Sequence, residues 1–69
     1  DADYALAIDF YTRCMKHKEL KTNALLRRSR IYLIQTQWSL AEDDAKAVID
    51  SDADKSSKAF AQSILDNIQ

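Results

Sequence analysis

Apolar residues recur at three- and four-residue steps along four stretches of the chain, which is the spacing of helices that bury one face. The first stretch shows it in Tyr4, Ala7, Ile8 and Tyr11. The same spacing returns three times before the end of the sequence. The pattern predicts helices over residues 3–18, 23–35, 37–51 and 54–68.

Short polar segments separate the predicted helices. They lie at residues 19–22, 35–37 and 51–53. Thr22 and Thr36 are candidate N-caps, because a hydroxyl can accept a hydrogen bond from a free backbone N–H. Asp52 or Asp54 would cap the last helix, where a negative charge is favourable. Such short joints force neighbouring helices to be antiparallel. The periodicity alone leaves a closed bundle and a stack of helical hairpins equally open.

The composition agrees with a small helical domain. The 69 residues include no Gly and no Pro, the usual turn residues of a short sheet protein, and 46% are apolar. A net charge of −1 creates no general attraction to nucleic acid or membrane, and no apolar run approaches the roughly 18 residues of a membrane span. The single Cys14 favours a reducing compartment. We expect the cytoplasm, with the nucleus left open.

The chain repeats itself in character at an offset of 34 residues. Tyr4 falls on Trp38, and Ala7 falls on Ala41. Large residues coincide with large ones, and small residues with small ones. This offset is the period of the tetratricopeptide repeat, in which each unit is a pair of antiparallel helices. The repeat therefore favours a stack of helical hairpins over a closed bundle.

The segment over residues 25–32 resembles the first-helix signature of the tetratricopeptide family. Ser29 stands where the family has a small residue at a helix crossing, and Tyr32 stands at the signature tyrosine. Arg28 departs from the usual Leu, and Ala45 departs from the usual aromatic residue. The resemblance implies an all-α antiparallel helix-pair solenoid of about four helices. It divides the chain into a half-repeat at 1–21, a full repeat at 22–55 and the first helix of another repeat at 56–69.

The resemblance also implies a function, since first helices of this family line a concave groove that takes a peptide or helix of a partner protein. Arg27 and Arg30 could bind carboxylates through paired N–H groups. We therefore expect an acidic or amphipathic protein segment as the ligand. The alternative is that both arginines are simply solvated. The expected groove residues are Asn23, Leu26, Arg27, Arg30, Leu33, Ile34, Lys55, Ser57, Phe60, Ala61, Ile64 and Ile68.

A second function of a different class is self-association. About two repeats leave the outer helix faces without a neighbour, and repeat units bury their apolar faces on one another. The chain would then be a structural segment of a longer solenoid, or a homodimer joined through its open ends. The residues expected to be exposed there are Tyr4, Ile8 and Phe10 at one end, and Ile64, Leu65 and Ile68 at the other.

Two patterns that suggest catalysis or metal binding are better explained otherwise. Cys14 and His17 could meet on one helix face, but no third residue orients His17, so we expect no enzyme activity. Glu42, Asp43 and Asp44 are consecutive, and consecutive helical residues point in different directions. We expect a solvated acidic face there, with no bound metal and no cofactor.

The basic run Arg27-Arg28-Ser29-Arg30 has the composition of a nuclear signal or a basophilic kinase site, both of which have many false positives. The resemblance places Ser29 at a buried crossing, where a kinase could not reach it. Nucleic-acid binding would need aromatic side chains beside the cations, and the resemblance assigns Tyr32 to the core. We therefore expect a protein partner and no nucleic acid.

Overall fold

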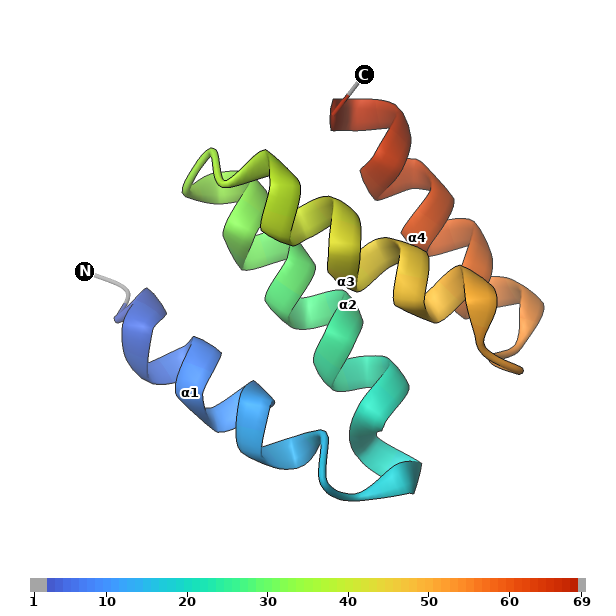
Figure 1. Ribbon diagram of the computed structural model, residues 1–69, viewed down its shortest axis with the longest axis horizontal. Helices are drawn as coiled ribbons and strands as arrows, with labels where there is room; N and C mark the ends of the chain where they lie inside the picture. The colour runs from blue at the N-terminus through green and yellow to red at the C-terminus, as the bar shows by residue number, and fades with distance from the viewer. Residues whose placement is uncertain (1–2, 69) are drawn as a thin grey trace.

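The computed structural model describes residues 3–68, which fold into four helices joined by short turns. The helices are α1 (Tyr4–Cys14), α2 (Lys18–Ile34), α3 (Trp38–Asp50) and α4 (Lys55–Ile68). Successive helices pack antiparallel, as Figure 1 shows. The predicted all-α fold of four antiparallel helices is confirmed.

Helix α2 occupies the middle of the molecule and contacts the other three helices. Helix α3 packs against both α2 and α4. Within residues 3–68, α1 contacts α2 alone and reaches neither α3 nor α4, so the four helices do not close into a bundle. Figure 1 shows α1 and α4 on opposite sides of α2. The face of α2 that carries the exposed Arg27 and Arg30 is called its open face below.

The first and last helices begin at aspartates that cap them. The backbone N–H of Leu6 donates to Asp3 Oδ1 at 3.0 Å, and that of Ser57 donates to Asp54 Oδ1 at 2.9 Å. Hydrogen bonds from the side chain and the backbone of Ser57 lower the pKa of Asp54. The prediction that an aspartate caps the last helix is confirmed, and Asp54 is the residue that does so.

The predicted boundary between the first two helices is wrong. Helix α1 ends at Cys14 and α2 begins at Lys18, so the turn lies at residues 15–17 instead of residues 19–22. Met15 packs against the hydrophobic core, and a tight turn places it there. Thr22 therefore lies inside α2, and the actual N-cap, His17, makes no side-chain capping bond. Neither Gly nor Pro marks this turn in the sequence.

Thr36 lies in the turn that terminates α2, two residues beyond its last residue, and does not cap the third helix as predicted. Its φ of 59° lies in the left-handed region. Its N–H donates to the Leu33 carbonyl at 3.0 Å, and the N–H of Gln37 donates to the Tyr32 carbonyl at 2.8 Å. This pair of bonds is the Schellman motif, whose left-handed position is usually Gly. A β-branched residue is strained at that position.

Replacing Thr36 with Gly is therefore expected to stabilise the protein by about 1 kcal/mol, since Gly adopts positive φ without a Cβ clash. Urea unfolding followed by circular dichroism measures the change. The matched control is Thr22→Gly in the interior of α2, where the same substitution is expected to lower stability. A loss of stability in Thr36→Gly would show that the turn is not strained.

The core lies where α2, α3 and α4 meet. Small residues at the crossings, Ala41 and Ala45, let α3 approach its neighbours closely, and both are fully buried. Ser29 is also fully buried, as expected, and its hydroxyl donates to the Leu26 carbonyl at 2.8 Å. The contiguous buried cluster consists of Leu25, Leu26, Ala45, Val48, Ala61, Ile64 and Leu65.

The expectation that α4 exposes an apolar face is wrong for two residues of this cluster. Ile64 and Leu65 were predicted to be exposed, but α4 turns both of them into the core. The reason is that α4 packs against α3 and α2 together, so two sides of α4 are covered. Ile68 is half-buried against the same cluster.

Candidate functional site

A partly buried ion pair joins α2 to α3. Arg28 Nε and Nη2 donate to the two carboxylate oxygens of Asp44 on α3, each at 2.7 Å. The side chains of Arg28 and Asp44 are 17% and 7% exposed. The expectation that Asp44 belongs to a solvated acidic face is therefore wrong, because the Arg28 guanidinium draws it inward. This hydrogen bond to Asp44 raises the pKa of Arg28.

The same arginine also holds α1 in place. Arg28 Nη1 donates to Thr12 Oγ1 at 2.9 Å, and the Thr12 hydroxyl donates to the Ile8 carbonyl within α1 at 2.7 Å. The guanidinium lies 5.7 Å from the ring centre of Tyr32 on its own helix, within the range of cation–π attraction. Arg28 thus links α1, α2 and α3 through one side chain.

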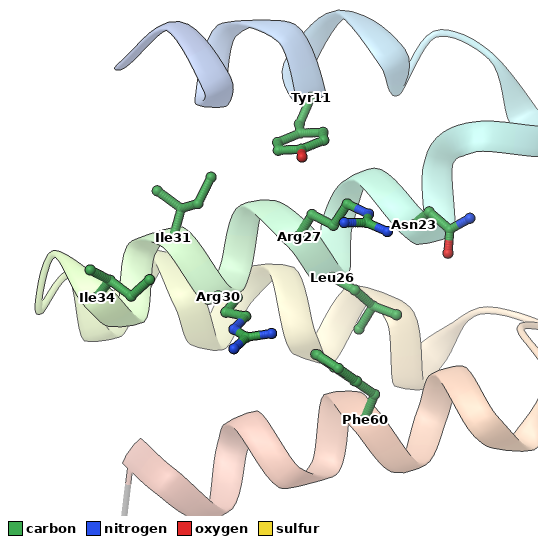
Figure 2. A pocket seen from close by; sticks show the side chains of 8 residues that line it. All are labelled: Tyr11, Asn23, Leu26, Arg27, Arg30, Ile31, Ile34 and Phe60. Atoms are coloured by element: carbon green, nitrogen blue, oxygen red, sulfur yellow. The ribbon is translucent and has the colours of Figure 1, made fainter. Parts of the chain in front are cut away.

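The open face of α2 forms the floor of a groove with a volume of about 380 Å³. Figure 2 shows Tyr11 reaching toward α2 from α1 on one side, and Phe60 reaching toward it from α4 on the other. A hollow of this size lies in the range of ligand-binding sites. Its lining residues are Tyr11, Asn23, Leu26, Arg27, Arg30, Ile31, Ile34 and Phe60.

A second hollow of about 280 Å³ adjoins the first between α2 and α4. Arg30 and Phe60 line both hollows and stand between them. The remaining lining residues of the second hollow are Leu33, Ser63, Ile64 and Asn67. The two hollows together make one surface that extends from α1, across α2, to α4, and we call this surface the central groove.

The structure brings together eight of the twelve residues expected to line a groove. They are Asn23, Leu26, Arg27, Arg30, Leu33, Ile34, Phe60 and Ile64. The other four lie outside both hollows. Lys55 and Ser57 belong to the first turn of α4, and Ser57 donates to its cap. Ala61 is fully buried in the core, and Ile68 packs against that core.

Four lining residues were not expected from the sequence: Tyr11, Ile31, Ser63 and Asn67. Tyr11 was assigned to packing on the first helix, because the resemblance gives the groove to the second and fourth helices only. Ile31 follows Arg27 by four positions and so shares its side of α2, which is a signal that the helical period does contain. Ser63 and Asn67 are likewise four positions apart and so share one side of α4.

The central groove is positively charged. Arg27 and Arg30 line it, and no acidic residue does. Within residues 3–68, the ion pairs join Arg13 to Asp9, Arg28 to Asp44 and Lys46 to Glu42, so neither groove arginine has a carboxylate partner. Two unpaired guanidiniums beside apolar side chains can bind a carboxylate and an apolar group at once.

The other candidate sites do not assemble. Cys14 is the last residue of α1, whereas His17 stands in the turn, so the two are not on one helix face. Among residues 3–68, no group of three or more His, Cys, Asp or Glu side chains could hold a metal ion. In the same part of the chain, no helix is both long enough and apolar enough to cross a membrane.

Comparisons with protein-family models, with curated proteins and with solved structures found no match to this chain.

Proposed function

We propose that this chain is a protein-interaction module whose central groove binds an acidic, amphipathic segment of a partner protein. The observation that carries the proposal is a pair of arginines, Arg27 and Arg30, which have no carboxylate partner in the described part of the chain. They are set among Leu26, Ile34 and Phe60. An arginine pair without acids attracts carboxylates, and the apolar side chains beside it gain by losing contact with water. The proposed role is binding without catalysis.

We further infer that the four helices form tetratricopeptide-like repeats within a solenoid. Two pairs of helix ends support the 34-residue period: α1 and α3 begin at Tyr4 and Trp38, and α2 and α4 end at Ile34 and Ile68. The contacts of α1 with α2 alone also suit an open stack of helices. The beginning of α2 departs from the period, because α1 ends earlier than the period requires and the turn after it is also shorter than the turn before α4.

The charge of the groove provides the test of the proposed function. Arg30→Glu is expected to weaken binding of a fluorescein-labelled acidic peptide with leucine anchors by at least about tenfold, because one attraction becomes a repulsion. Fluorescence anisotropy measures the affinity. Lys21→Glu is the matched control, since it makes the same charge change on α2 outside the groove. Equal weakening in both variants would mean that net charge, and not the groove, governs binding.

A second candidate function is self-association through the outer face of α1. Leu6 and Phe10 lie one helical turn apart on that face and are 65% and 60% exposed. Under the 34-residue repeat they correspond to Leu40 and Asp44, and Asp44 faces α2. The Leu6–Phe10 face is therefore where α1 would accept a helix of a second copy.

Phe10→Lys distinguishes this second candidate. If the Leu6–Phe10 face pairs two copies, the wild-type mass should rise with concentration in size-exclusion chromatography with light scattering, and the variant should stay monomeric. Burial of an exposed phenylalanine stabilises an interface by about 1.5–3 kcal/mol, which is enough to shift such an equilibrium. If the wild-type protein is monomeric at all concentrations, self-association is wrong, and binding in the central groove stays as the proposed function.

A further inference from the structure

The groove-facing side chains of α2 form a regular stripe. Asn23, Arg27, Arg30 and Ile34 are separated by four, three and four positions, and all four are exposed. Side chains at this spacing lie on one face of a helix along a line nearly parallel to its axis. The same spacing occurs on helices that pack lengthwise against a second helix, with side chains of one fitting between those of the other.

We propose that the occupant of the central groove is an α-helix that lies along α2, with acidic side chains facing Arg27 and Arg30 and an apolar side chain beside Ile34. This inference rests on the proposed function and specifies the form of the partner. The occupant lies between Tyr11 and Phe60, which bound the stripe on its two sides in Figure 2. Because Ile34 is the apolar end of the stripe, the apolar side chain of the partner lies at that end.

The hydrogen-bonding capacity of the groove favours a helix over an extended segment. An extended peptide exposes backbone N–H and C=O groups, which need partners when they are buried. The larger hollow offers few uncharged polar groups for them, namely the amide of Asn23 and the hydroxyl of Tyr11. A helical occupant pairs its own backbone groups, so Arg27 and Arg30 stay available for side-chain carboxylates.

The length of the stripe sets the size of the occupant. From Asn23 to Ile34 the stripe covers 11 residue steps, which is about 16 Å at the rise of an α-helix. A partner helix of about three turns would cover it. Helices this short are marginal in water by themselves. The partner segment is therefore either part of a folded helix or becomes helical when it binds.

Three labelled peptides of equal charge test the form of the occupant. The first is an alanine-based 15-residue peptide with two glutamates three positions apart and a leucine four positions beyond them. In the second, a central alanine becomes proline, which breaks the helix. In the third, the glutamates are five positions apart and so leave the common face. The proposal expects both altered peptides to bind at least about tenfold more weakly than the first.

A charge exchange shows whether binding occurs at the stripe. The double variant Arg27→Glu and Arg30→Glu should no longer bind the first peptide. It should instead bind a version of that peptide in which lysines replace the glutamates. Lys18→Glu with Lys21→Glu is the matched control, because it makes the same charge change at exposed positions of α2 that line neither hollow. Circular dichroism of each variant confirms that the helices are retained.

The outcomes separate this inference from the proposed function. If the proline peptide binds as well as the first peptide, and the arginine double variant loses both, the groove binds acidic segments but the helical occupant is wrong. If none of the three peptides binds the wild-type protein, the helical occupant and the proposed function both fail. A helical occupant requires that the first peptide bind more tightly than the other two. It also requires that the arginine double variant prefer the lysine version of that peptide.

Discussion

Replacing Asp44 with alanine is expected to lower the free energy of unfolding by about 3 kcal/mol. The substitution leaves the partly buried guanidinium of Arg28 without the carboxylate that accepts from its Nε and Nη2 groups at 2.7 Å. Removing one partner of a buried ion pair is costly because the other charge remains without water. A loss of this size is a large fraction of the stability of a domain with so small a core.

Urea unfolding followed by far-ultraviolet circular dichroism measures this change. Asp43→Ala is the matched control, since Asp43 is the neighbouring aspartate and is exposed, and its effect should stay within about 0.5 kcal/mol. The combined variant Arg28→Met with Asp44→Leu should recover much of the loss, because it leaves no unpaired charge. A loss below about 1 kcal/mol in Asp44→Ala would mean that water reaches the ion pair freely.

Leu65→Ala is also expected to cost about 3 kcal/mol. Leu65 is 7% exposed and packs in the cluster that holds α4 against the rest of the molecule. Truncating a buried leucine removes apolar contact area and leaves a cavity, which together cost about 2–5 kcal/mol. Leu40→Ala is the same substitution at a residue that is 42% exposed, and it should cost less than about 1 kcal/mol.

The Leu65 comparison decides between two positions for α4. If α4 lay with Leu65 outward, as expected for a repeat unit without a neighbour, the two leucine variants would unfold at similar urea concentrations. The structure requires that Leu65→Ala unfold at the lower concentration. Because Phe60 and Ile64 of α4 line the central groove, loosening α4 should also weaken binding of an acidic peptide.

The number, type and order of the helices could be predicted from hydrophobic spacing. α3 begins one residue after the predicted start and ends one before the predicted end, and α4 ends at the predicted Ile68. The α1–α2 turn could not be placed. It lacks Gly, Pro and a capping side chain, and its position depends on Met15 reaching the core. That contact depends on the packing of helices distant in the sequence.

The buried ion pair could not be predicted for a similar reason. Asp44 is the last of three consecutive acidic residues in the sequence, and only the packing of α3 against α2 makes it buried while its neighbour Asp43 is exposed. Arg28 was noticed as a departure from the expected Leu. The structure gives a physical reason for that departure, since the arginine replaces an apolar contact with an ion pair to α3 and a hydrogen bond to α1.

The central groove could be predicted in part. Arg27, Arg30 and Ile34 share one face of α2 by helical period alone, and their charge asymmetry was visible in the sequence. The contribution of Tyr11 could not be predicted, because it depends on α1 lying beside α2 as the wall of the groove. Arg28 helps to fix that wall through Thr12, so the stability of the fold and the shape of the groove share one residue.

A nuclear magnetic resonance titration of the ¹⁵N-labelled protein with the acidic helical peptide shows directly whether the central groove is the binding site. Binding in the central groove should shift the amide signals of Asn23, Arg27, Arg30, Ile34 and Phe60 as peptide is added, because these residues line the groove. Signals of Leu6 and Phe10, on the outer face of α1, should stay in place. Shifts confined to Leu6 and Phe10, or no shifts at all, would contradict the claim that the central groove is the binding site.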